Sequence, residues 1–141
     1  MDVAIRLAVA VVFVWLGMVL AISFMEAPLK FHVPGVSLQV ALSIGRVVFF
    51  ALNICELLFA LVLGSAVYSH DTPLSVDLAC AVAITALMIQ LLMVRPTLAR
   101  HTTSVLGGDE GPRSGGHYVY VGLEVVKVIA LITSGVILTG L

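Results

Sequence analysis

The chain has 141 residues, of which 61% are hydrophobic and 11% are charged, and its formal net charge at pH 7 is −1. Soluble domains have about 25% charged residues, so this chain has too few to cover a surface that faces water. With a mean hydropathy of +1.19, the composition is that of an integral membrane protein whose first partner is the lipid bilayer. The small negative charge argues against nucleic-acid binding, which needs a basic stripe.

The first long apolar run, residues 7–25, is predicted to be a retained membrane helix. A helix needs about 20 apolar residues to cross the hydrocarbon core. A secretory signal has a shorter apolar core of about 7–15 residues, followed by a small-residue cleavage site. The run exceeds that core, and no clean cleavage site comes before Glu26, Ala27 and Pro28. We therefore expect this helix to remain in the protein.

Three further apolar runs, at residues 47–68, 78–94 and 118–141, are also predicted to cross the membrane. In lipid the backbone polar groups must be satisfied internally, which only helices and closed barrels achieve. The runs are continuous and lack alternation at period two, so we expect helices. The sequence thus predicts one all-α domain over residues 1–141, an integral membrane four-helix bundle.

The links between the four runs are short and contain turn residues. Residues 26–43 hold two prolines and a glycine, which predict a turn. Residues 36–46 could form an interfacial helix that leads into the second span. A tight polar turn is expected at residues 69–75, and the glycine-rich stretch within residues 105–116 predicts a flexible loop.

The basic residues predict the orientation of the bundle. With four spans, the first and third links share one side of the membrane. Together these links carry five basic residues, which are Lys30, Arg46, Arg95, Arg100 and Arg113, whereas the other side has only Arg6 near its segments. The positive-inside rule then places both links in the cytoplasm and both termini outside. We expect the inner or plasma membrane of the cell.

The two halves of the chain resemble each other in the positions of their polar residues. Residues 46–56 align with residues 117–127, and every polar position coincides. The three polar pairs are Arg46 with His117, Asn53 with Glu124, and Glu56 with Lys127. Because each half holds two helices, the alignment predicts a parallel repeat with its axis along the membrane normal. The alternative is a chance similarity between apolar helices.

Charged residues inside two of the spans mark a candidate site. A charge at membrane depth costs about 3 kcal/mol or more on insertion scales, so it normally faces a partner or a cavity. Positions i, i+7 and i+10 lie near one helix face, which predicts two polar faces that meet inside the bundle. The residues of the predicted polar core are Arg46, Asn53 and Glu56 on the second helix, and Tyr120, Glu124 and Lys127 on the fourth.

Glu56 and Lys127 are predicted to form a buried pair. Glu56 follows Arg46, and Lys127 follows His117, by ten positions, which is about 15 Å along a helix and places both near mid-membrane. Glu124, at i−3 from Lys127, is a second partner for the same lysine. Polar groups that only hold helices together contribute about 0.6–2 kcal/mol per contact. Four ionisable groups and an asparagine exceed that need, which favours a functional polar core.

The histidines predict a cofactor site only weakly. His32, His101 and His117 are expected on the cytoplasmic side, where they could bind a metal or haem. No two histidines have i, i+4 spacing, and no Cys-x-x-Cys accompanies them. Membrane haems need axial histidines on buried helices, and only His117 begins a helix. Histidines at the membrane interface are therefore the favoured interpretation, and the sequence assigns no cofactor.

Two patterns resemble known families. The four-helix layout, with residues 26–31 and the helix start at residues 45–49, is similar to small bacterial integral membrane proteins of unassigned function. Asn53 and Glu56 form an Asn-x-x-Glu pair in the second helix, which resembles the membrane-associated eicosanoid and glutathione metabolism family. This resemblance implies glutathione contacts for these two residues. The arginine-rich surroundings and the later arginine and tyrosine signature of that family are not evident here.

The sequence favours a small membrane protein whose polar core binds or passes a small solute, an ion or a proton. A small membrane enzyme or redox subunit that holds a cofactor at the same residues is one alternative. An accessory subunit of a larger membrane complex is the other, and a homo-oligomer fits either. No group of nucleophile, base and orienting residue stands out, so catalysis stays open.

Overall fold

The computed structural model describes the backbone of residues 3–94 and 115–141, and the side chains of residues 3–92 and 119–141. The described residues are helical apart from short links and contain no strand. The predicted all-α fold is therefore confirmed for this part of the chain.

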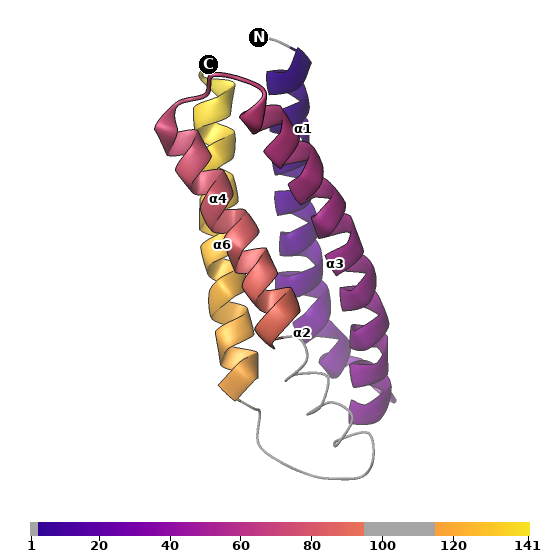
Figure 1. Cartoon of the computed structure of the whole chain (residues 1–141). Coiled ribbons are helices and arrows are strands. Elements are labelled where there is room, and N and C mark those ends of the chain that lie inside the picture. Colours follow the sequence, from indigo (N-terminus) through magenta and orange to yellow (C-terminus); the bar gives the residue numbers. More distant parts are fainter. Residues whose placement is uncertain (1–2, 95–114) are drawn as a thin grey trace.

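Four helices of the described chain are long and apolar enough to cross a membrane (Figure 1). They cover Val3–His32, Leu38–Tyr68, Leu74–Leu92 and Val119–Thr139. No more than 39% of the most apolar stretch of any of them is buried inside the protein. Because helices that are apolar all round need an apolar environment, these features indicate a multi-pass membrane protein.

The first span is one helical rod made of four segments. The α-helix α1, Val3–Val19, continues into the π-helix η1, Leu20–Glu26. The short helix α2, Ala27–Leu29, and the 3-10 turn η2, Lys30–His32, complete the rod. The rod therefore extends beyond residue 25, where the apolar run ends.

Pro28 lies inside this rod, where the sequence predicted a turn. Just before it, the N–H of Ala27 donates to the carbonyl of Ile22, five residues back, as in a π-helix. Proline has no N–H and is tolerated in the first turn of a helical segment, the position that Pro28 occupies in α2. The turn comes later, at residues 33–37, where Gly35 adopts a φ of +83°.

The second span is the helix α3, Leu38–Tyr68, of 31 residues. Ser37 caps it, because its hydroxyl oxygen accepts a hydrogen bond of 3.2 Å from the N–H of Val40. Residues 38–46 therefore belong to this helix and do not form a separate interfacial helix.

The third and fourth spans follow a short turn at residues 69–73. The α-helix α4, Leu74–Ile89, ends in the π-helix η3, Gln90–Val94. The helix α6, Gly115–Thr139, is the last element. Most of the loop predicted at residues 105–116 lies outside the described residues.

Helices α1 and α6 each pack closely against two other helices. Helix α1 packs against both α3 and α6, and α6 also packs along α4, whereas α3 approaches α4 less closely. Both termini lie at the same end of the bundle as the turn between α3 and α4 (Figure 1). The fully buried core includes Trp15, Leu63, Leu87, Leu131 and Leu138. Such a core fixes the three helices that carry the residues described next.

Candidate functional site

Four buried polar side chains from three helices meet inside the bundle. We call this group the charged cluster, and its members are Glu56 of α3, Gln90 of η3, and Glu124 and Lys127 of α6. None of them is more than 2% exposed. Each is therefore removed from solvent and from lipid, and its polar atoms depend on one another.

Lys127 is the centre of the charged cluster. Its Nζ donates to Oε1 and Oε2 of Glu56 at 2.8 and 2.9 Å, and to Oε1 of Gln90 at 2.9 Å. It also forms an ion pair with Oε1 of Glu124. An ammonium group has three N–H donors, so these acceptors satisfy it completely. The pairing of Glu56 with Lys127 that the sequence predicts is present in the structure.

Gln90 connects the charges through its side-chain amide. Its Oε1 accepts from Lys127, while its Nε2 donates to Oε1 of Glu124 at 2.9 Å and to the backbone carbonyl of Tyr120 at 3.2 Å. Gln90 is the first residue of η3, and π-helical turns are frequent at functional sites. Gln90 was not among the predicted site residues, although an amide inside an apolar span was the available signal.

The charged pair lies at one depth in the bundle. Glu56 is twelve residues before Tyr68, the end of α3, and Lys127 is twelve residues before Thr139, the end of α6. Twelve residues correspond to about 18 Å along a helix, which is close to the middle of a hydrocarbon core about 30 Å thick. The ion pair therefore lies near the middle of such a core, whereas Gln90 lies near the end of its span, Leu74–Leu92.

Trp15 of α1 adds a fourth helix to the surroundings of Glu56. Its side chain is fully buried, and its ring lies 6.4 Å from that of Phe59, centroid to centroid. The indole N–H makes no hydrogen bond of ordinary geometry, but it interacts with the Glu56 carboxylate. The indole is thus a further polar neighbour of the cluster.

Two other predicted site residues are buried near the cluster, and one is not. Asn53 is 6% exposed, lies one turn before Glu56, and has no hydrogen-bond partner for its Oδ1. Tyr120 is 7% exposed, and its ring meets that of Phe49 edge to face at 5.9 Å. Arg46 is exposed, so it does not share the interior with the others.

The charged cluster holds two carboxyl groups and one ammonium group. Glu56 has both oxygens bonded to Lys127, whereas Glu124 uses only Oε1. The second oxygen of Glu124, Oε2, is buried without a hydrogen-bond partner. If both carboxyl groups are ionised, the cluster has one uncompensated negative charge in a region where charge is costly.

A second ion pair lies near the other end of the first span. Lys30 Nζ is 3.8 Å from Oε2 of Glu26, and it lies 5.6 Å from the ring centroids of both Phe31 and Phe49. Gly45 leaves room for this ammonium, because a Cβ there would be 2.7 Å from Nζ. The contacts are those of a cation held over aromatic rings.

Within the described residues, the histidine candidates do not form a site. His32 is exposed at the end of η2. His101 and the side chain of His117 lie outside the described residues. Within the described part of the chain, no group of three or more His, Cys, Asp or Glu residues is placed to hold a metal ion.

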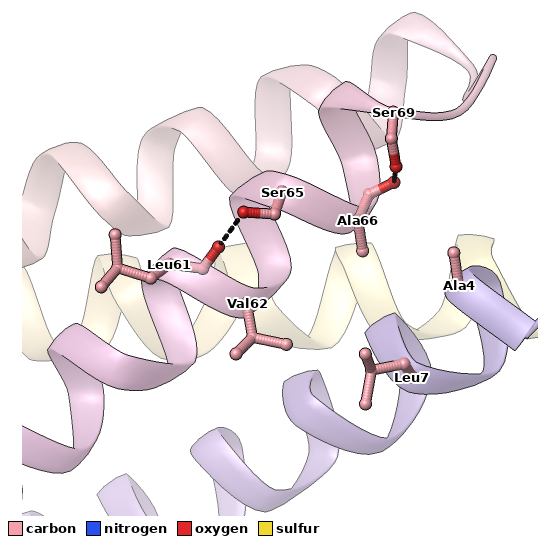
Figure 2. A pocket seen from close by; sticks show the side chains of 7 residues that line it. All are labelled: Ala4, Leu7, Leu61, Val62, Ser65, Ala66 and Ser69. Carbon is pink, nitrogen blue, oxygen red and sulfur yellow. Dashed lines mark hydrogen bonds between the residues drawn. The ribbon is translucent and has the colours of Figure 1, made fainter.

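An open groove of about 410 Å³ lies between α1 and α3, away from the charged cluster (Figure 2). Its lining is mainly apolar. The hydroxyls of Ser65 and Ser69 donate to the carbonyls of Leu61 and Ala66 nearby in the chain, so their O–H donors are already used (Figure 2). Such a groove suits lipid chains better than a polar solute.

Comparison with known proteins finds no family model, no curated protein and no solved structure that matches this chain. Its function must therefore be argued from the charged cluster itself.

Proposed function

We propose that this chain is a small multi-pass protein of the cell's inner or plasma membrane whose charged cluster binds or passes a small solute, an ion or a proton. The observation that carries the proposal is the burial of Glu56, Glu124 and Lys127, with Gln90, inside a bundle of four apolar helices. Ionisable groups at membrane depth commonly belong to substrate, ion or proton pathways.

A purely structural role fits the charged cluster less well. Polar contacts between membrane helices contribute about 0.6–2 kcal/mol each, and an uncharged pair such as two serines supplies them. Glu56 and Lys127 would balance each other without a third charge. Glu124 adds an excess carboxyl group that a structural contact does not need, and its Oε2 has no hydrogen bond. This excess supports a role in binding.

We propose that the two helix pairs form a parallel repeat. Glu56 and Lys127 are 71 residues apart and are equally far from the ends of their helices. The π-helices η1 and η3 begin at Leu20 and Gln90, almost the same distance apart along the chain. Two π-helices at equivalent places in the two halves support the repeat. In such a repeat the charged cluster lies between the halves, as binding sites do in transporters built from repeats.

We propose further that both termini face the outside of the cell. The observation in favour is the number of basic residues in the first and third links, together with the position of both termini at one end of the bundle (Figure 1). A membrane enzyme with a bound cofactor and an accessory subunit of a larger complex are the alternatives. A visible absorption band of the purified protein would favour the enzyme, and a native mass above one chain would favour an assembly.

A flux assay in reconstituted vesicles tests the proposed function. The purified protein is placed in lipid vesicles, and the passage of protons, alkali cations and small anions is measured with ion-selective dyes. We expect one of these to move faster than in empty vesicles, and Lys127→Met to abolish the difference. Arg6→Met, which removes an exposed cation of α1, is the matched control and should keep the wild-type rate. Equal rates for wild-type, Lys127→Met and empty vesicles would contradict the passage of these ions.

A further inference from the structure

We infer that the ligand of the charged cluster is a single proton, taken up on Oε2 of Glu124. This inference rests on the proposed function and narrows it to one ligand. In the uptake step, hydronium at the membrane surface gives its proton to the Glu124 carboxylate, which becomes a neutral carboxylic acid, and water is left behind. The argument has three parts, which concern hydrogen bonds, charge and space.

The hydrogen bonds single out one oxygen. Both oxygens of Glu56 accept from Lys127, and Oε1 of Glu124 accepts from Gln90. Oε2 of Glu124 is buried with no hydrogen-bond partner. A proton on this atom leaves every hydrogen bond of the cluster in place, whereas both oxygens of Glu56 are already engaged as acceptors. Oε2 of Glu124 is therefore the oxygen that takes a proton with least disturbance.

The charges of the cluster give a reason for uptake. Glu56 and Glu124 together supply two negative charges against the single positive charge of Lys127. One proton makes the cluster neutral, and neutral groups are much better tolerated at membrane depth than charged ones. Among the residues whose side chains the structure describes, the other polar or titratable groups buried at this level are Trp15 of α1, Asn53 of α3, Gln90 of η3 and Tyr120 of α6. None of these four supplies a second positive charge.

The lack of space argues against a larger ligand. The four side chains of the cluster are at most 2% exposed, and Lys127 Nζ already occupies the position among the oxygens that a metal cation would need. A metal cation would also be repelled by this ammonium. A proton needs no added volume. The groove between α1 and α3, which has the volume for a solute, is lined by other residues.

Infrared spectroscopy of the purified protein in lipid nanodiscs tests the inference, with the proton itself as the probe. A pH titration of the wild-type protein should show the carbonyl stretch of one buried carboxylic acid, which shifts in deuterated water. Glu124→Gln should remove this band. Glu26→Gln, a control at the ion pair near the end of the first span, should keep it. Absence of the band in the folded wild type, or its survival in Glu124→Gln, would overturn the inference.

The wild-type protein alone covers the case in which Glu124→Gln does not fold, because a folded wild type without the acid band overturns the inference.

The infrared and flux results also separate this inference from the proposed function. If an alkali cation or an anion moves in vesicles in a way that needs Lys127, but no acid band exists, the proton assignment is wrong and the proposed function stands. If the acid band is present and protons move only in protein that retains Glu124, both are supported. If neither the band nor any flux that depends on the cluster is found, both are wrong.

Discussion

Lys127 of α6 donates to both carboxylate oxygens of Glu56 of α3, at 2.8 and 2.9 Å, although the two residues are 71 positions apart in the chain. The two helices have few backbone contacts, because α1 packs against each of them. Their long side chains therefore make the connection that the backbones do not. This ion pair joins the first helix pair to the second at mid-membrane.

The first prediction concerns the coupling of this pair. Glu56→Gln leaves Lys127 buried without its main counter-ion, and breaking a buried pair typically costs about 3–5 kcal/mol. The lysine can reduce this loss if its flexible chain reaches toward the headgroups. We expect a lower midpoint of thermal unfolding in detergent for Glu56→Gln and for Lys127→Met. The double variant should recover much of the loss, and strictly additive losses would show that the two residues do not interact.

The second prediction concerns Gln90. Gln90→Leu keeps a similar volume but removes the acceptor for Lys127 and the donor to Glu124. Leaving buried polar groups unsatisfied costs about 1–3 kcal/mol, so we expect a measurable fall in unfolding free energy in detergent. Gln39→Leu, at an exposed position near the start of α3, is the matched control and should change stability little. Equal stabilities of the two variants would contradict a bridging role for Gln90.

The third prediction concerns the contact between α1 and α6. A Cβ at Gly135 would lie 2.8 Å from the ring of Phe13, so Gly135→Ala should force the helices apart and cost about 1–3 kcal/mol. Phe13→Leu should restore part of the loss in the same chain. At Gly122 no atom lies within 4 Å of the added Cβ, and Gly122→Ala should stabilise the helix by about 0.5–1 kcal/mol. Thermal unfolding of these three variants tests the prediction, and a harmless Gly135→Ala would refute the close contact.

The fourth prediction concerns orientation. A single cysteine placed at Asp71, in the exposed turn between α3 and α4, should react with an impermeant thiol reagent added outside intact cells. One placed at Val33, exposed beyond η2, should react only after the membrane is opened. Both are made after replacing Cys55 and Cys80. The opposite labelling pattern would reverse the orientation while leaving the four helices unchanged.

The architecture could be predicted from the sequence because a continuous apolar run in lipid can satisfy its backbone hydrogen bonds only as a helix or within a closed barrel. The ends of the helices were harder to predict, since helix formation does not stop where apolar residues stop. Ser37 starts α3 well before the apolar run, and the π-helix η1 lets the first rod continue through Pro28. Both effects depend on local hydrogen bonds that hydropathy does not record.

Part of the candidate site could be predicted for a similar reason. Glu56 and Lys127 stand out because a charged side chain inside an apolar span is costly unless it faces a partner or a cavity. Arg46 was grouped with them by spacing, but ten residues at about 100° each leave it about 80° around the helix from Glu56. It also lies near the start of α3, where it is exposed. Gln90 was not included in the predicted site because the comparison of the two halves aligned only the second and fourth spans.

The measurement that tests the central claim most directly is the flux assay applied to the double variant Glu56→Gln with Lys127→Met. This variant removes both charges of the ion pair, so it should recover much of the stability that either single change loses, although Glu124 no longer has Lys127 as its counter-ion. The account predicts that its vesicles nevertheless pass the transported ion no faster than empty vesicles. Wild-type flux in this folded double variant would show that the charged cluster holds the helices together and does nothing more.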